Sequence, residues 1–168
     1  MRNFGIYGAV LASLFLSGGQ AMGATASASA TVVTPITVTK NVDLEFGSFS
    51  PDPGYVGTIT LTPALMTARS KTGTGLTLYT SAISAAKFTI TGTDSQTFTF
   101  VLPSSAQSMV GSVTGTMNAT NFTSDLTSGT AALVSGSKVM YVGATLNVGA
   151  NQVSGEYTGS FDVTVAYN

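Results

Sequence analysis

From about residue 25 onward, apolar and polar side chains alternate along the chain with a period of two residues. The clearest runs are residues 57–62, 86–91 and 97–102, in which Ile, Leu, Phe or Ala takes every second position. Such alternation is typical of strands with one buried face, and short strands at this spacing predict an all-β sandwich rather than a parallel α/β sheet. Turn residues at 92–95 predict a hairpin between the last two runs.

The alternation changes phase once, within residues 139–148. Apolar side chains take odd positions at Val139 and Tyr141, but even positions from Ala144 onward. Because a slip of one residue turns every later side chain over, we expect a bulge or bend near Gly143. A short helical turn is considered at residues 64–68. Loops are predicted at residues 51–54, 69–75, 103–108, 123–130 and 149–155.

The longest alternation covers residues 26–46, with Ala, Val, Ile, Leu and Phe among the even positions. Its length of roughly 20 residues exceeds the five or six of an ordinary strand. We therefore expect breaks at Pro35, which cannot donate to a central ladder, and at Lys40–Asn41. Residues 25–38 then form an extended N-terminal arm or a first strand, and residues 39–168 form the β-sandwich domain. Whether the arm pairs with its own domain or with another molecule stays open.

The C-terminal residues 157–168 also alternate, and they predict a single strand that reaches the last residue. Its apolar face holds Tyr157, Gly159, Phe161, Val163, Val165 and Tyr167. A strand of this kind presents unpaired backbone groups at a sheet edge, and we expect another segment to cover an apolar edge of this kind. An ordinary strand buried in its own sheet is the alternative.

Residues 1–24 have the features of a secretory signal peptide. Arg2 gives a positive start, residues 6–16 form a short apolar run, and cleavage is plausible after Ala21 or Ala24. The run is shorter than the roughly 20 residues that span a bilayer, so we expect no stable membrane span; a retained anchor is the alternative. The chain is expected to be secreted or held at a bacterial cell surface, with the periplasm in transit.

Composition narrows the possible functions. Charged residues make up 8% of the chain, whereas a typical soluble domain has about a quarter. The six Lys and Arg residues are scattered, which argues against nucleic-acid binding. The chain has no Cys and no His, so disulfides, thiol nucleophiles, the common zinc sites and the usual general base are excluded. We therefore expect no enzyme activity and no cofactor.

Three carboxylates are the only candidates for a metal or acid–base site. Asp43 and Glu45 lie two residues apart on one strand face, with Asp52 close in sequence. Such carboxylates can bind calcium or transfer protons, but solvated charges on a polar strand face are the simpler interpretation. Ser104 and Ser105 have no His or suitable Lys beside them, so neither is a candidate nucleophile. We predict no catalytic residue and no metal site.

Two segments carry a resemblance to a known family: DLEFGSFSP at residues 43–51 and GEYTGSFDVTVAYN at residues 155–168. With them the chain resembles bacterial chaperone–usher pilins of the archaic type, which are grouped with spore-coat-like secreted proteins. The chain is also similar to an uncharacterised bacterial domain family of unknown function that shares both ends and the segment VGATLNV at residues 142–148. The second likeness covers nearly all of the chain after the leader.

The resemblance implies an immunoglobulin-like, antiparallel sandwich that lacks one strand. It also implies donor-strand addition: a periplasmic chaperone fills the gap first, and the N-terminal arm of another subunit then replaces it. Carried over, the arm is roughly residues 24–38, and its inward residues are Ala28, Ala30, Val32, Ile36 and Val38. The receiving edge, or chaperone contact, is Phe161, Val163, Val165 and Tyr167.

The sequence thus favours a structural subunit of a fimbria or cell-surface assembly that associates with further copies and with a periplasmic chaperone. The alternative is a monomeric secreted module that binds carbohydrate or protein. Aromatic platforms for that role would be Tyr55, Tyr79, Tyr141 and Tyr157. An enzyme is the third and weakest hypothesis, because its site would rest on sparse carboxylates.

Overall fold

The computed structural model describes residues 22–168, so most of the predicted leader lies outside the described residues. The chain consists of two parts that meet after Thr31, and each is described by itself. In the first part, residues 22–31 are exposed and belong to no strand. Among the described residues no helix has the length and apolar character needed to cross a membrane.

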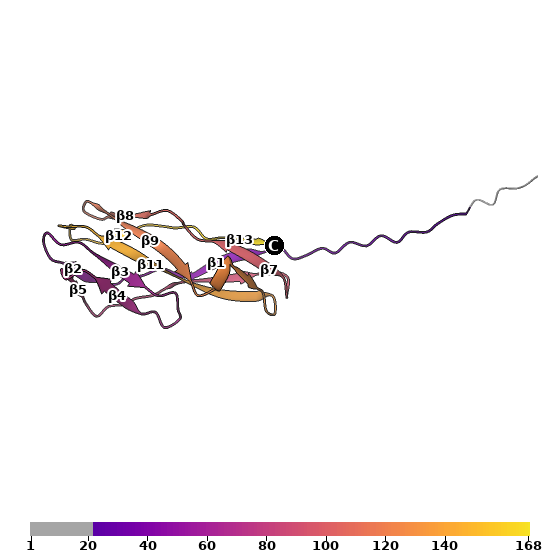
Figure 1. Ribbon diagram of the computed structural model, residues 1–168, viewed down its shortest axis with the longest axis horizontal. Coiled ribbons are helices and arrows are strands. Elements are labelled where there is room, and N and C mark those ends of the chain that lie inside the picture. Colours follow the sequence, from indigo (N-terminus) through magenta and orange to yellow (C-terminus); the bar gives the residue numbers. More distant parts are fainter. Residues whose placement is uncertain (1–21) are drawn as a thin grey trace, which may run out of the picture. The chain divides into compact units, whose positions relative to one another are not determined.

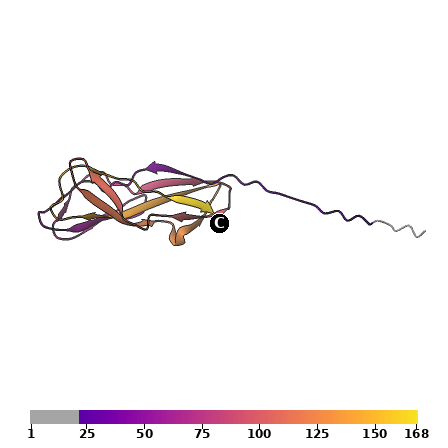
Figure 2. The ribbon, with the colours of Figure 1, turned by 90° about the horizontal axis from the view of Figure 1, so that it is seen from above.

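Residues 32–168 form an all-β domain whose strands pair in antiparallel fashion (Figures 1 and 2). Within residues 22–168 the one helical element is a 3-10 turn, η1 (Thr127–Gly129). The largest sheet is curled like half a barrel and has eight strands. These are β1 (Thr37–Val42), β3 (Gly57–Leu61), β4 (Arg69–Thr72), β6 (Ala86–Thr91), β8 (Gln107–Gly111), β9 (Thr116–Ser124), β11 (Ser137–Val148) and β12 (Tyr157–Thr158).

The strand order of the large sheet is β1-β6-β11-β9-β8-β12, with β3 paired to β11 and β4 paired to β3. Two smaller sheets complete the domain. One has the order β10-β7-β13, and the other pairs β2 with β5. Their bounds are β2 (Phe49–Pro51), β5 (Leu76–Leu78), β7 (Thr97–Val101), β10 (Thr130–Ala132) and β13 (Thr164–Tyr167).

Strand β11 joins the two ends of the domain. The first half of one of its edges pairs with β6, and the second half pairs with β3. Along the opposite edge its register with β9 shifts between Gly143 and Thr145, so an irregularity lies at the predicted position, but the extra residue belongs to β9. The predicted change of phase is wrong, because even-numbered side chains from Met140 to Val148 are buried on both sides of Gly143. A Cβ at Gly143 would lie 2.2 Å from the carbonyl oxygen of Leu61, so only glycine lets the neighbouring chain approach this closely.

The core consists of two apolar clusters, one at each end of β11. The first packs the inward faces of β3, β9 and the second half of β11, with Ile59 and Leu146 almost fully buried. The second lies between the large sheet and the sheet of β7, where Ile90 and Phe98 are fully buried. Alternation along β3, β6 and β7 therefore predicted the buried faces correctly.

Several sequence-based expectations are wrong in detail. Residues 92–95 do not close a hairpin, because β6 and β7 belong to different sheets; their apolar faces pack face to face across the second cluster. Residues 69–75 are not only a loop, since β4 begins at Arg69 and pairs with β3. Residues 63–66 form a bend and not a helical turn. The predicted C-terminal strand is split into β12 and β13.

The N-terminal alternation does not form one long strand: no strand precedes Pro35 within residues 22–34, and β1 continues through Lys40–Asn41 with a register shift rather than a break. Strand β1 begins at Thr37, two residues after Pro35, and pairs with β6. Its register shifts between Lys40 and Val42, which is where the second break was expected. Within this alternation, residues 26–36 belong to no strand, residues 37–42 form β1, and residues 43–46 belong to the segment that leads to β2.

Candidate strand-binding groove

A long groove opens in the domain between a segment near its N-terminus and a segment near its C-terminus. Its volume is about 1110 Å³. That exceeds the roughly 300–1,000 Å³ of ordinary small-molecule pockets. One wall is formed by residues 43–51 and the other by residues 152–163, and the floor comes from β6, β9 and β11. Below, these are the N-terminal wall and the C-terminal wall.

Five residues of the C-terminal wall have no hydrogen-bond partner. Residues 159–163 lie between β12 and β13, and neither their backbone nor their side chains hydrogen-bond to any other residue of the described chain. Their neighbours are paired: β12 with β8, and β13 with β7. The gap is therefore an interruption within one extended segment.

The interruption follows from the length of the segment that faces it, residues 101–110 of the same chain. From Val101 to Val110 the chain takes nine steps, but from Thr158 to Thr164 it takes only six, so the segment after β7 must bulge. Continuing the β7–β13 register by two residues would place Asp162 opposite Pro103. Because proline has no N–H, the ladder loses a donor there. Residues 159–163 are thus left without a partner on that side.

On the other side the wall faces the groove. The backbone N–H of Asn168 donates to Thr97, and Thr164 pairs with Val101, so the even-numbered residues turn their backbone toward β7. In an extended chain, neighbouring residues turn their N–H and C=O groups to opposite sides. The odd-numbered residues of the wall therefore turn theirs toward the groove. This geometry suits the addition of a strand.

An aromatic cluster holds the C-terminal wall against the floor. The ring of Phe161 lies 4.8 Å from the ring of Phe122 and 6.2 Å from that of Phe88, measured between centroids. Both separations fall in the range of favourable aromatic pairs. Phe161 and Phe122 stay half-buried, so the groove leaves part of their apolar surface in water. An apolar occupant would cover it.

The N-terminal wall has one bonded side and one free side. Glu45 exchanges both backbone hydrogen bonds with Ser84, at 2.9 and 3.1 Å. By the same alternation, Leu44 turns its backbone toward the groove, and within the described chain neither its N–H nor its C=O has a partner. Arg69 fixes the far end, donating to the carbonyl oxygens of Phe46 at 2.8 Å and Ser48 at 3.2 Å. The wall is thus held at both ends, while the backbone of Leu44 on its inner side is unpaired.

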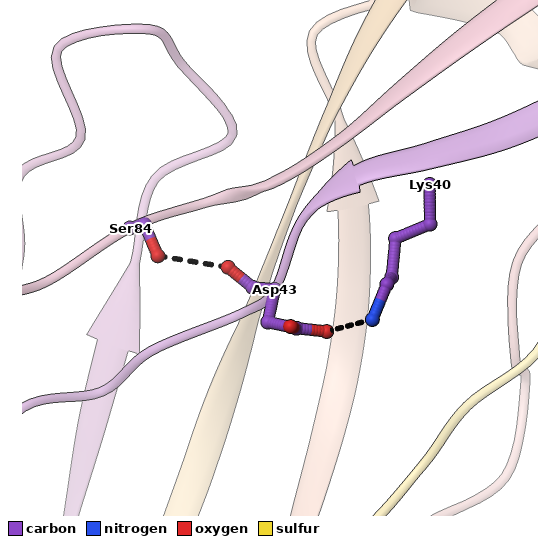
Figure 3. Close-up of polar contacts among 3 residues, drawn as sticks. All are labelled: Lys40, Asp43 and Ser84. Carbon is purple, nitrogen blue, oxygen red and sulfur yellow. Dashed lines mark hydrogen bonds and ion pairs between the residues drawn. The ribbon is translucent and has the colours of Figure 1, made fainter.

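Two charged side chains at the rim form an ion pair (Figure 3). Lys40 pairs with the carboxylate of Asp43, and Ser84 Oγ donates to the carbonyl oxygen of Asp43 at 2.8 Å. No group of three potential metal ligands occurs in the part of the chain that the structure describes, residues 22–168. Residues that line the groove include four of the seven acidic side chains and one basic one: Asp43, Glu45, Glu156 and Asp162, with Lys40. An occupant without negative charge is therefore favoured.

The structure separates the predicted arm residues into two groups. Ala28, Ala30 and Val32 precede Pro35 and are exposed. Ile36 and Val38 are half-buried against the second core cluster of their own domain, and Val38 pairs with Ile90. Residues 36–38 are thus already part of the folded domain. The segment still available as a donor is residues 25–33, called the leading segment below.

The predicted receiving-edge residues fall on both sides of the interruption. Phe161 and Val163 line the groove, whereas Val165 and Tyr167 lie in β13, paired with β7. Sequence reasoning assigned no role to the N-terminal wall, although residues 43–51 carried part of the family resemblance. The four tyrosines considered as platforms form no aromatic pair among residues 22–168. Of these four, Tyr157 lines the groove.

Comparison with protein-family models gives one result for this chain. A model described as a domain of unknown function, DUF4402, matches residues 36–167. The chain belongs to this family. The DUF4402 match begins one residue before β1 and includes both walls and the floor of the groove, and it leaves the leading segment outside. Comparisons with curated proteins and with solved structures found no match.

Proposed function

We propose that this chain is a secreted structural subunit of a fimbria or other bacterial cell-surface assembly, joined to its neighbours by donor-strand addition. The observation that carries the proposal is the unpaired backbone of residues 159–163 at the side of the groove. Under this proposal the fold is an immunoglobulin-like sandwich with one strand missing. The groove is the place of that strand, and a periplasmic chaperone occupies it during export.

The energetic argument starts from the backbone. An unpaired backbone group that loses its water costs about 1–3 kcal/mol, so an apolar occupant that brings no N–H or C=O groups would be penalised. A strand supplies both, and it fills side-chain positions at every second residue. Among macromolecular ligands, an extended peptide therefore satisfies both walls at once.

The leading segment has the chemistry of such an occupant. Residues 25–33 carry no charge and alternate small or apolar residues with Thr and Ser. Buried Ala28 and Ala30 would contribute about 0.8 kcal/mol each, and Val32 about 1.5–3 kcal/mol. Side chains alone therefore give modest affinity, and the backbone hydrogen bonds must supply the rest.

The geometry also sets a direction for the assembly. Thr34, near the start of the domain, lies beside Tyr167, at the end of β13. From there the groove runs toward Pro51 and Gln152, near β2 and β12. A donor segment that runs antiparallel to the C-terminal wall would begin near β13 and end near β2 and β12. The domain of the donor subunit would then follow at the β2–β12 end of the acceptor. Repetition of this contact gives a head-to-tail fibre.

The test is a deletion of residues 25–33, which keeps Thr34 and every strand in place. We expect the shortened chain to fold and to stay monomeric, whereas the full-length chain forms fibres visible by electron microscopy. A synthetic peptide of residues 25–33 should bind to the shortened chain and protect the amides of residues 159–163 from hydrogen exchange. A matched control peptide carries Val32→Asp, which places a charge among apolar positions.

Fibres formed by the shortened chain would rule out the leading segment as the connector. A full-length chain that stays monomeric at high concentration and does not bind the peptide would contradict the proposal as a whole. It would then favour the monomeric surface-binding module.

A further inference from the structure

Tyr167 holds the residue from which the leading segment departs. Its hydroxyl donates to the carbonyl oxygen of Thr34 at 2.8 Å and accepts from the backbone N–H of Thr93 at 2.6 Å. The N–H of Thr34 donates to Thr93 Oγ1 at 2.8 Å. Both backbone groups of Thr34 are therefore engaged, by partners from the far end of the chain and from the turn after β6.

The surrounding residues are shaped to admit this hydroxyl. A Cβ placed on Gly92 would lie 2.1 Å from the Tyr167 oxygen, so any larger residue there would displace it. The ring of Tyr167 packs half-buried against the second core cluster. The contact thus connects β13 to the start of the domain, where β1 and β13 approach each other.

This contact matters because the next residue is Pro35. A Thr-Pro pair is a favourable beginning for a reverse turn, with proline at the second position. A turn at this point would send residues 25–33 back along β1 and into the groove of their own chain. The turn would use the Thr34 carbonyl as its acceptor, and that carbonyl already accepts two hydrogen bonds, from the Tyr167 hydroxyl at 2.8 Å and more weakly from Thr93 Oγ1 at 3.4 Å.

Without such a barrier the chain's own segment would win the groove. A segment tethered by a short linker has an effective concentration in the millimolar range, well above that of free copies in dilute solution. A subunit that donates its segment to another copy therefore needs a device against self-closure. We infer that the Tyr167 hydroxyl is part of this device: a latch that disfavours docking of residues 25–33 in their own groove and so favours a second copy. The inference rests on the proposed function.

The experiment uses two cysteines as reporters, because the chain has none of its own. Counted from the Thr34–Tyr167 contact, a folded-back segment would bring residue 29 beside residue 162. Ser29→Cys and Asp162→Cys, both at exposed positions, therefore report self-closure by forming an intramolecular disulfide. Into this background we introduce Tyr167→Phe or, as matched control, Tyr141→Phe, whose hydroxyl makes no hydrogen bond within residues 22–168.

In dilute solution, where the chains are monomeric, Tyr167→Phe should form the disulfide about fivefold to tenfold faster than the control, as expected for loss of one net hydrogen bond. Fibre growth of the variant without added cysteines should slow, because self-closed chains cannot donate. Thr93→Val, which removes the acceptor for the Thr34 N–H, should act in the same direction. It provides a second test if Tyr167→Phe does not fold.

Equal disulfide rates in all variants, together with fibre growth by the full-length chain, would overturn the latch and leave the proposed function intact. Failure of the full-length chain both to form fibres and to bind the peptide of residues 25–33 would overturn the proposed function, and the latch would fall with it.

Discussion

Residues 159–163 and residues 164–167 follow each other in one extended segment, yet they differ in how the backbone is satisfied. Both parts alternate half-buried apolar residues with exposed polar ones. The second part, β13, pairs with β7 through four register positions and is closed at its end by the Tyr167 hydroxyl. The first part has no hydrogen bond to any other described residue. Side-chain burial and backbone pairing are therefore separate properties of the same strand.

The difference shows how a domain can be folded and still have an open site. In the closed part, two sheets cover a core in which Phe98 and Ile90 are fully buried. In the open part, the wall is held to the floor by the ring of Phe161. An apolar contact is enough to position a strand, while its backbone groups remain available for another strand. The site is thus positioned by packing, and under the proposed function an added strand completes its backbone pairing.

The largest expected effect compares one phenylalanine from each part. Phe98→Ala removes a fully buried ring from the closed part and should lower the free energy of unfolding by about 3–5 kcal/mol. Phe161→Ala removes a half-buried ring at the groove and should cost about 1–2 kcal/mol, because less surface was removed from water. Urea denaturation followed by circular dichroism gives both values. Equal losses would mean that the groove is part of the closed core.

Hydrogen exchange tests the same comparison on the backbone. Amides of residues 159–163 should exchange on the order of a hundredfold faster than the β13 amides that are bonded to β7, because the first group needs no opening of a ladder. Mass spectrometry or NMR on the deletion variant lacking residues 25–33 measures both sets without an occupant. Protection of residues 159–163 in that variant would show that the wall already has a partner.

Much of the fold could be predicted from the sequence because it depends on local pattern. Alternation identified the buried faces of β3, β6 and β7. The apparent change of phase in β11 was misleading, because its buried side chains keep the same parity and the extra residue near Gly143 belongs to β9. Pairing partners were not accessible in the same way. The turn after β6 has the composition of a hairpin, but whether two strands pair at their edges or pack at their faces is decided by the rest of the core.

The site was predictable only in part, for a similar reason. The alternation at the C-terminus identified Phe161 and Val163 as a candidate edge, and both line the groove. The interruption between β12 and β13 depends on a count of residues in the opposite chain and on Pro103, which no pattern within residues 157–168 contains. Contact between Thr34 and Tyr167 spans 133 residues and has no local signal at all. The prediction of the site was therefore limited by contacts between residues far apart in the sequence, and not by composition.

The smallest expected effect concerns the ion pair of Lys40 and Asp43 at the rim. Both side chains are more than half exposed, at 55% and 66%, so water and salt screen their attraction. A double-mutant cycle with Lys40→Met and Asp43→Asn should give a coupling of about 0.2–1 kcal/mol in thermal or urea unfolding, falling as salt is added. The carbonyl of Asp43, which accepts from Ser84 Oγ, is kept in both variants. A coupling well above that range and insensitive to salt would show that the ion pair, and not backbone pairing and Arg69, holds the N-terminal wall. Electrostatics would then have to be added to packing and backbone pairing as a cause of the difference between the two regions.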